Sequence, residues 1–130
     1  MAPGCAGGED ACVAPSVLIV DDHARFRRTA RRALERDGWT IAGEAVDGTG
    51  ALRAARALQP DVVLLDVGLP DMSGLEVARR LHDEVPQLAV VMISTHDSAD
   101  YHELAVANGA RGFLAKSELT GAALDALLGG

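Results

Sequence analysis

The sequence predicts an α/β protein with a (βα)5 fold, in which one doubly wound, parallel, five-stranded sheet is covered by helices on both faces. Two observations support this prediction. Short apolar runs alternate along the chain with longer segments of helical spacing, and four of the five runs are continuously apolar. Because a strand that is polar on one face alternates, continuous apolar runs indicate strands buried on both faces of a parallel sheet.

Each predicted strand is followed by a predicted helix. The strands are expected over residues 17–21, 40–45, 62–66, 89–94 and 112–116. The helical patterns lie within residues 24–38, 49–59, 73–85, 98–109 and 117–130. Stop signals agree with these boundaries, because Gly38 and Gly109 follow the last helical turns and Pro60 and Pro86 precede the third and fourth strands.

Length and composition favour one domain with an aliphatic core. The chain has 130 residues, of which 48% are hydrophobic and only 3% aromatic. Residues 1–15 contain both cysteines, Cys5 and Cys12, but no apolar segment like that of a signal peptide. We therefore expect a disordered leader over residues 1–15 and a single domain over residues 16–130.

Charge and hydropathy restrict which partners and which cellular compartment we expect for this domain. Its net charge of −7 opposes direct contact with nucleic acid. No run approaches the roughly 20 apolar residues needed to span a bilayer. The pair of cysteines in the leader lacks a second Cys/His pair for a metal site. We expect a protein of the reducing cytoplasm, with no membrane contact.

Polar side chains follow four of the predicted strands at the point where each strand ends. Asp21 and Asp22 end the first strand, Asp66 the third, Ser94 the fourth and Lys116 the fifth. In doubly wound sheets the functional crevice lies at the carboxyl ends of the strands. These five residues, scattered along the chain, are therefore expected to converge on one site.

The residue types at these strand ends favour phosphoryl chemistry. Three carboxylates in one crevice repel each other unless a cation neutralises them, and Mg²⁺ prefers one or two carboxylates while leaving room for a phosphoryl oxygen. Asp66 is the candidate nucleophile for an aspartyl phosphate. Lys116 would supply a positive charge, and the Ser94 hydroxyl could donate to a phosphoryl oxygen.

This pattern resembles the receiver domains of bacterial two-component response regulators over residues 17 to about 128. The motifs that carry the resemblance are "VDDH", "DVGLPDMSG", "MIST" and "GFLAK". The resemblance implies a flavodoxin-like strand order of 2-1-3-4-5. It also implies that Asp66 accepts a phosphoryl group from a histidine kinase or phosphotransfer protein. The Mg²⁺ ligands would be Asp21, Asp22, Asp66 and the backbone carbonyl of Gly68.

The resemblance further implies a signalling switch rather than an enzyme, with at most self-phosphorylation and autodephosphorylation. Phe113 occupies the position of the switch aromatic and would act with Ser94. The signal would leave through the fourth helix, the fifth strand and the last helix. Access to the phosphoryl group is expected to be tuned by Gly68, by His96 and by Thr95, which stands where the family usually has Ala.

The C-terminal segment is most similar to that of the subfamily with LuxR-type helix-turn-helix outputs. Ser117 replaces the Pro common after the lysine, so we expect Ser117 to cap the last helix rather than follow a cis bond. The last helix is apolar on more than one side. This predicts a homodimer or a partner site over residues 119–128, unless the small Ala side chains there simply tolerate exposure.

Two other classes share this kind of sheet. A haloacid-dehalogenase-like phosphotransferase would need a D-x-D pattern after the first strand, where this chain has "DDHAR". A flavodoxin-like cofactor binder would need a glycine- and hydroxyl-rich loop at the same place. A third alternative is that the chain is the receiver fragment of a longer DNA-binding transcriptional regulator.

Two further residue groups have open interpretations. Six of the 12 basic residues lie in the first helix, either as a solvated face or as a docking stripe for an acidic partner helix. They are Arg25, Arg27, Arg28, Arg31, Arg32 and Arg36. The four histidines lack a metal-ligand spacing, so we interpret them as surface or loop residues. They are His23, His82, His96 and His102.

Overall fold

The structure, a computed structural model, describes residues 15–95 and 99–129. Its elements follow one another in the order β1 (Ser16–Val20), α1 (Ala24–Arg36), β2 (Thr40–Ala45), α2 (Gly48–Leu58), β3 (Val62–Asp66), α3 (Gly74–Glu84), β4 (Ala89–Ser94), α4 (Ala99–Ala107), β5 (Gly112–Ala115), the 3-10 turn η2 (Lys116–Glu118) and α5 (Gly121–Leu127). The leader with its two cysteines lies outside the described residues, so its predicted disorder stays a prediction.

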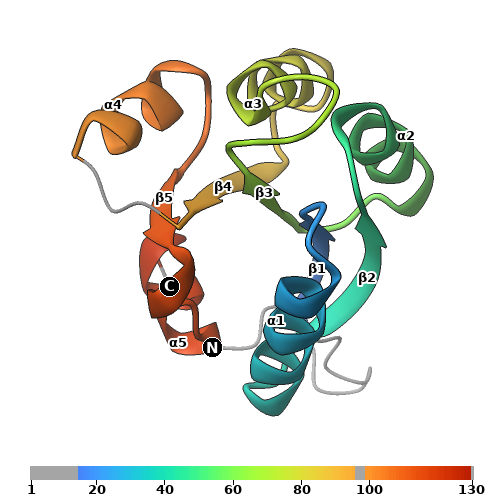
Figure 1. Ribbon diagram of the computed structural model, residues 1–130, viewed down its shortest axis with the longest axis vertical. Coiled ribbons are helices and arrows are strands. Elements are labelled where there is room, and N and C mark those ends of the chain that lie inside the picture. Colours follow the sequence, from blue (N-terminus) through green and yellow to red (C-terminus); the bar gives the residue numbers. More distant parts are fainter. Residues whose placement is uncertain (1–14, 96–98, 130) are drawn as a thin grey trace.

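One parallel sheet with the strand order β2-β1-β3-β4-β5 forms the centre of the molecule. Figure 1 shows α2, α3 and α4 on one side of this sheet and α1 and α5 on the other. The predicted fold class and strand order are confirmed. In the part of the chain that the structure describes, no helix has both the length and the apolar character that crossing a bilayer requires.

Each face of the sheet has its own aliphatic core, because successive strand residues point to opposite faces. Leu18 and Met92 belong to the core beneath α2, α3 and α4. Ile19 and Ile93 belong to the core on the side of α1 and α5, together with Leu34. Each of these side chains is fully buried, which stabilises the fold by about 1.5–3 kcal/mol per residue.

The predicted strands agree with the structure except at three ends: β1 begins at Ser16 rather than at residue 17, and β1 and β5 each end one residue early. The second, third and fourth strands have the predicted boundaries. β1 ends at Val20 rather than at Asp21, although the amide of Asp21 still donates to the carbonyl of Ala45 at 3.1 Å. β5 ends at Ala115, and Lys116 begins the turn η2.

The prediction that Ser117 caps the last helix is wrong. Ser117 lies within η2, and α5 begins four residues later at Gly121. The hydroxyl of Thr120 accepts the hydrogen bond from the amide of Ala123 and caps α5. The carboxylate of Asp37, beyond the end of α1, accepts from the amide of Gly121 at 2.8 Å. A contact between segments 84 residues apart therefore sets where α5 starts.

The leucines of the C-terminal segment are not surplus apolar surface. Leu124 is fully buried, and Leu119, Leu127 and Leu128 pack against the core on the side of α1 and α5. Only small side chains, such as Ala122 and Ala126, are exposed on α5. The alternative that Ala tolerates exposure therefore fits α5 better than an uncovered apolar face.

The turn between β3 and α3 brings two backbone segments into close contact. The amide of Gly74 donates to the carbonyl of Val67 at 2.8 Å. A Cβ atom at position 74 would collide with the carbonyl oxygen of Asp66, whereas a Cβ at Gly68 would lie 3.9 Å from Oδ2 of Asp66. Gly74 is thus required for the close approach that positions Asp66, and Gly68 is not.

Asp71, in the same turn, fastens it to the first turn of α2. Its carboxylate accepts hydrogen bonds from the amides of Gly48 and Thr49 at 2.7 and 3.0 Å, and from the Thr49 hydroxyl at 2.9 Å. The backbone bonds from Gly48 and Thr49 lower the pKa of Asp71 to about 2. This contact ties the loop after Asp66 to a separate helix.

We expect Gly74→Ala to lower the free energy of unfolding by about 2 kcal/mol, because the added methyl must displace the backbone of Asp66. Gly68→Ala is the matched control, since its methyl meets only ordinary contacts. Urea denaturation of both variants measures the effect. Equal stability of the two variants would contradict the packing argument.

We expect Asp71→Asn to lower the thermal midpoint near neutral pH and to do so progressively less as the solution is acidified. The folded-state pKa of about 2 lies below the unfolded value of about 3.9, so the stabilisation is present above pH 4 or so and disappears as the pH falls through about 2. Melting curves of both proteins across this range measure the difference. A difference that is constant with pH would refute the linkage.

Candidate functional site

The carboxyl edge of the sheet brings together the residues that the sequence analysis placed there. Asp21 follows β1, Asp66 ends β3, Ser94 ends β4 and Lys116 follows β5. Asp21, Asp66 and Ser94 are the buried polar residues among those the structure describes, with 0%, 6% and 7% of their surface exposed. The predicted convergence is therefore observed.

Lys116 connects two of these carboxylates. Its ammonium nitrogen lies 2.5 Å from Oδ2 of Asp21 and 3.2 Å from Oδ1 of Asp66. The side chain of Lys116 is only 11% exposed. The ammonium also lies 4.7 Å from the centre of the Phe26 ring, within the range of a cation–π contact. Phe26, in the first turn of α1, was not among the predicted site residues.

Burial and charge shift two pKa values in this cluster. The pKa of Asp66 is raised, first by burial and then by the negative charge of Asp21, against the lowering effect of Lys116. For Lys116, burial alone would lower the pKa, but the hydrogen bond to Asp21 and the negative charge of Asp66 raise it above its usual value. Lys116 is therefore charged at neutral pH, and a further cation would favour the ionised form of Asp66.

Asp22 and His23 extend the acidic cluster toward solvent. Nδ1 of His23 lies 3.0 Å from Oδ1 of Asp21 and 3.2 Å from Oδ1 of Asp22. One ligand atom from each of these three residues lies within 4.8 Å of the others, a spacing that suits a metal ion. The His23 side chain is 68% exposed. The interpretation of His23 as a surface residue is right about its exposure but missed its contact with the acid pair.

The residues expected to tune access have different positions. Gly68 is exposed in the turn after β3 and forms an isolated antiparallel bridge with Ser73. Thr95 is exposed directly after β4. His96 lies outside the described residues. Gly68 and Thr95 thus flank the strand ends that carry Asp66 and Ser94.

Phe113 is buried inside the core beneath α4. Its ring stacks on that of Tyr101 in α4, with centroids 5.9 Å apart and an interplanar angle of 20°. Phe113 is 8% exposed. Because Phe113 and Lys116 are three residues apart around the end of β5, the aromatic pair is joined to the site through a short stretch of backbone.

The arginines of α1 divide into two sets. Arg27 and Arg31 pair with Glu44 of β2. The other four line a shallow groove along the outer face of the helix, and no ion pair is found for them among the described residues. They are Arg25, Arg28, Arg32 and Arg36. These four exposed arginines are compatible with both interpretations, a solvated face and a docking stripe for an acidic partner helix.

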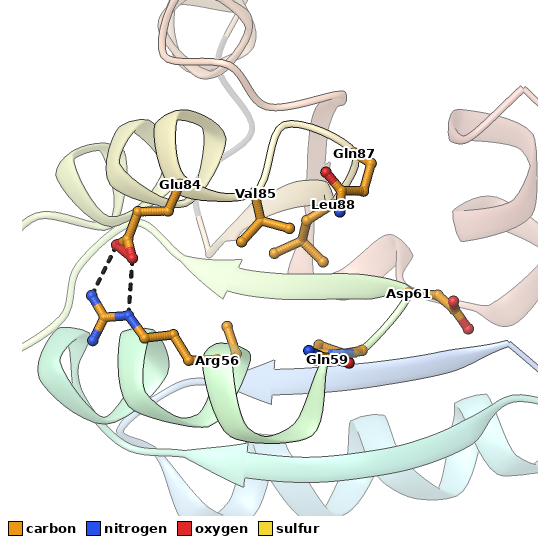
Figure 2. Close-up of a pocket in the computed structure, with 9 residues that line it drawn as sticks. Arg56, Gln59, Asp61, Glu84, Val85, Gln87 and Leu88 are labelled. Carbon is orange, nitrogen blue, oxygen red and sulfur yellow. Dashed lines mark hydrogen bonds and ion pairs between the residues drawn. The ribbon is translucent and has the colours of Figure 1, made fainter.

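A cavity of about 550 Å³ opens at the opposite, amino edge of the sheet, between the C-terminal ends of α2 and α3 (Figure 2). Its walls include Asp61, Val85 and Leu88. Across one end, Arg56 donates two hydrogen bonds to the carboxylate of Glu84, at 2.9 and 2.8 Å. None of the predicted site residues lines this cavity, so it is separate from the carboxylate cluster.

Comparison with known proteins agrees with this geometry. Residues 17–127 match the family described as the response regulator receiver domain. A putative transcriptional regulator of Pseudomonas aeruginosa is 42% identical over 102 residues, which are 78% of this chain and 49% of that protein. The virulence factors putative positive transcription regulator BvgA of Bordetella pertussis is 35% identical, with the same coverage.

Solved structures give the same result. The signal receiver domain of the putative response regulator NarL from Mycobacterium tuberculosis is 37% identical, with a TM-score of 0.79 and coverage of 89% of this chain and 98% of that one. A LuxR-family two-component response regulator from Aurantimonas sp. is 29% identical, also with a TM-score of 0.79, and covers 88% of this chain and 85% of that one. The chain spans about half the length of the curated relatives it matches. It belongs to the receiver domain family of two-component response regulators.

Proposed function

We propose that this receiver domain is a phosphorylation-dependent switch in which Asp66 accepts a phosphoryl group. The observation that carries the proposal is the position of Lys116, whose ammonium lies within 3.2 Å of Asp66 and 2.5 Å of Asp21. A fixed positive charge beside a carboxylate is what an incoming phosphoryl group requires for charge stabilisation. Ser94, at the end of the neighbouring strand, supports this role with a hydroxyl donor.

The donor set of the site fits Mg²⁺. Asp21, Asp22 and Asp66 offer hard carboxylate oxygens, and the Gly68 carbonyl adds a neutral oxygen in the adjoining turn. When bound, the ion supplies positive charge to the phosphoryl oxygens. The arrangement of these carboxylates depends on positive charge, since Lys116 bridges two of them.

The phosphoryl donor would be a phosphohistidine on a histidine kinase or phosphotransfer protein. A carboxylate oxygen of Asp66 forms a bond to phosphorus as the phosphorus–nitrogen bond breaks, and the electron pair leaves with the imidazole, which then takes a proton. Burial of Asp66 limits the access of water to the product. Gly68 and Thr95 border the approach to Asp66 and would tune the rates of transfer and hydrolysis.

The output would run through α4, β5 and α5. Phe113 and Tyr101 join β5 to α4, and Leu104 and Val106 expose 44% and 51% of their surface on α4. These two residues provide apolar surface that α5 lacks, so we place the contact with a partner or second copy mainly on α4.

The relatives suggest where such a switch operates. Two of them are named as transcriptional regulators, and this chain covers 49% of each. We infer that the domain acts in the cytoplasm as the receiver half of a DNA-binding regulator, and that DNA contact belongs to the other half. The net charge of −7 supports this division.

Acetyl phosphate is expected to modify the protein once, at Asp66, and only when Mg²⁺ is present. The modified form is separated on a phosphate-affinity gel. Asp66→Asn is expected to abolish the shifted band, and EDTA to prevent it, because the acidic cluster then repels the donor. Asp83→Asn, an exposed carboxylate of α3, is the control. A band that persists in Asp66→Asn contradicts the assignment of the site.

Beryllofluoride with Mg²⁺, used as a phosphoryl mimic, is expected to shift the ring resonances of Phe113 and Tyr101. The physical reason is that a ligand at Asp66 changes the position of Ser94 and Lys116, which lie at the ends of the two strands beside α4. NMR spectra of the wild type and of Ser94→Ala, each with and without the mimic, measure the coupling. Ring shifts of equal size in Ser94→Ala would exclude a role for its hydroxyl.

A further inference from the structure

Arg27 reaches from the first turn of α1 back to the backbone of the acid pair. Its Nη1 atom donates to the carbonyl oxygen of Asp21 at 2.7 Å, while its Nε atom donates to Oε1 of Glu44 at 2.8 Å. The side chain is only 16% exposed. A single guanidinium thus joins the end of β1, the helix α1 and the edge strand β2.

The backbone of Asp21 is held on both sides, by Ala45 of β2 and by Arg27 of α1. Its amide donates to the carbonyl of Ala45, and its carbonyl is bound by Arg27, which Glu44 holds in place. Asp21 lies one residue past the end of β1, where the regular strand pairing with β3 has stopped. The hydrogen bond from Arg27 therefore takes over from the sheet in fixing this peptide.

Glu44 is itself braced by a second arginine. Arg31, one turn further along α1, donates to Oε2 of Glu44 at 2.9 Å. Burial alone would raise the pKa of Glu44, but the hydrogen bonds from Arg31 and Arg27 lower it, so its carboxylate is charged at neutral pH. Arg27 is paired with Glu44 and binds the backbone carbonyl of Asp21 rather than its carboxylate, so its contribution to the acid pair is mainly geometric.

We propose that Arg27 is a positioning residue of the cation site, because its planar guanidinium fixes the peptide from which the Asp21 and Asp22 carboxylates project. This inference rests on the proposed binding of Mg²⁺ by the acid pair. Mutation of a group that orients metal ligands without touching the metal typically costs about 10–100-fold in metal affinity. Arg27 holds two acceptors at once, which a lysine at this position does not reproduce.

The test is the dissociation constant for Mg²⁺ alone, measured from the amide shifts of residues 20–24 and 66–68. Arg27→Gln is expected to raise this constant by about tenfold, the lower end of what is typical for a residue that supports a metal ligand. Arg27→Lys is expected to raise it similarly. Arg31→Gln is the matched control, because Arg31 shares Glu44 but does not touch Asp21, and it should raise the constant much less than Arg27→Gln does.

A second control separates positioning from stability. Asp61→Asn weakens the hydrogen bond from the Ser16 amide at the opposite edge of the sheet, and should lower the thermal midpoint without changing Mg²⁺ affinity. An Arg27→Gln protein with wild-type affinity, or full rescue by Arg27→Lys, overturns the inference and leaves the proposed function intact. Absence of any Mg²⁺-dependent shift in the wild type overturns the proposed function itself.

Discussion

The contact of the Lys116 ammonium with two buried carboxylates is the interaction on which the site depends. Asp21 and Asp66 are almost fully buried, and an unpaired charge in such a place costs several kcal/mol. Lys116 offsets this cost for both at once. Because Asp21 follows β1, Asp66 ends β3 and Lys116 follows β5, the three side chains meet only when the sheet is complete. The electrostatics of the site are thus a property of the whole fold rather than of one loop.

Sequence patterns correctly predicted the bounds of three strands but not the bounds of some other elements. β2, β3 and β4 begin and end where predicted, and Pro60 and Pro86 mark the loops before β3 and β4. The predicted start of the last helix was wrong, because the observed start depends on a residue from a distant segment. The carboxylate of Asp37 accepts a hydrogen bond from the amide of Gly121. A Cβ at position 121 would also collide with Asp37. Contacts of this kind leave no periodic signal in the local sequence.

The residues of the candidate site also fall into two groups, those that the sequence predicted and those that it missed. Asp21, Asp66 and Lys116 could be predicted to meet, because the carboxyl ends of parallel strands share one edge of the sheet. Phe26 and Arg27 were missed, because by periodicity one is a core residue of a helix and the other belongs to its charged face. Their role arises from tertiary placement, since the first turn of α1 lies beside the ends of β1 and β2. The sequence feature that could have indicated their role is their proximity to Asp21 and Asp22 along the chain.

β5 connects the site physically with α4. Side chains alternate along a strand, so Leu114 packs on the side of α1 and α5, while Phe113 and Ala115 face the other side. Lys116 follows directly and lies against Phe26 of α1. In the proposed switch, a displacement of Lys116 would act on the strand that holds Phe113 against Tyr101. Phe113 and Tyr101 would then shift together within the close-packed interior, beside the exposed apolar residues Leu104 and Val106 of α4.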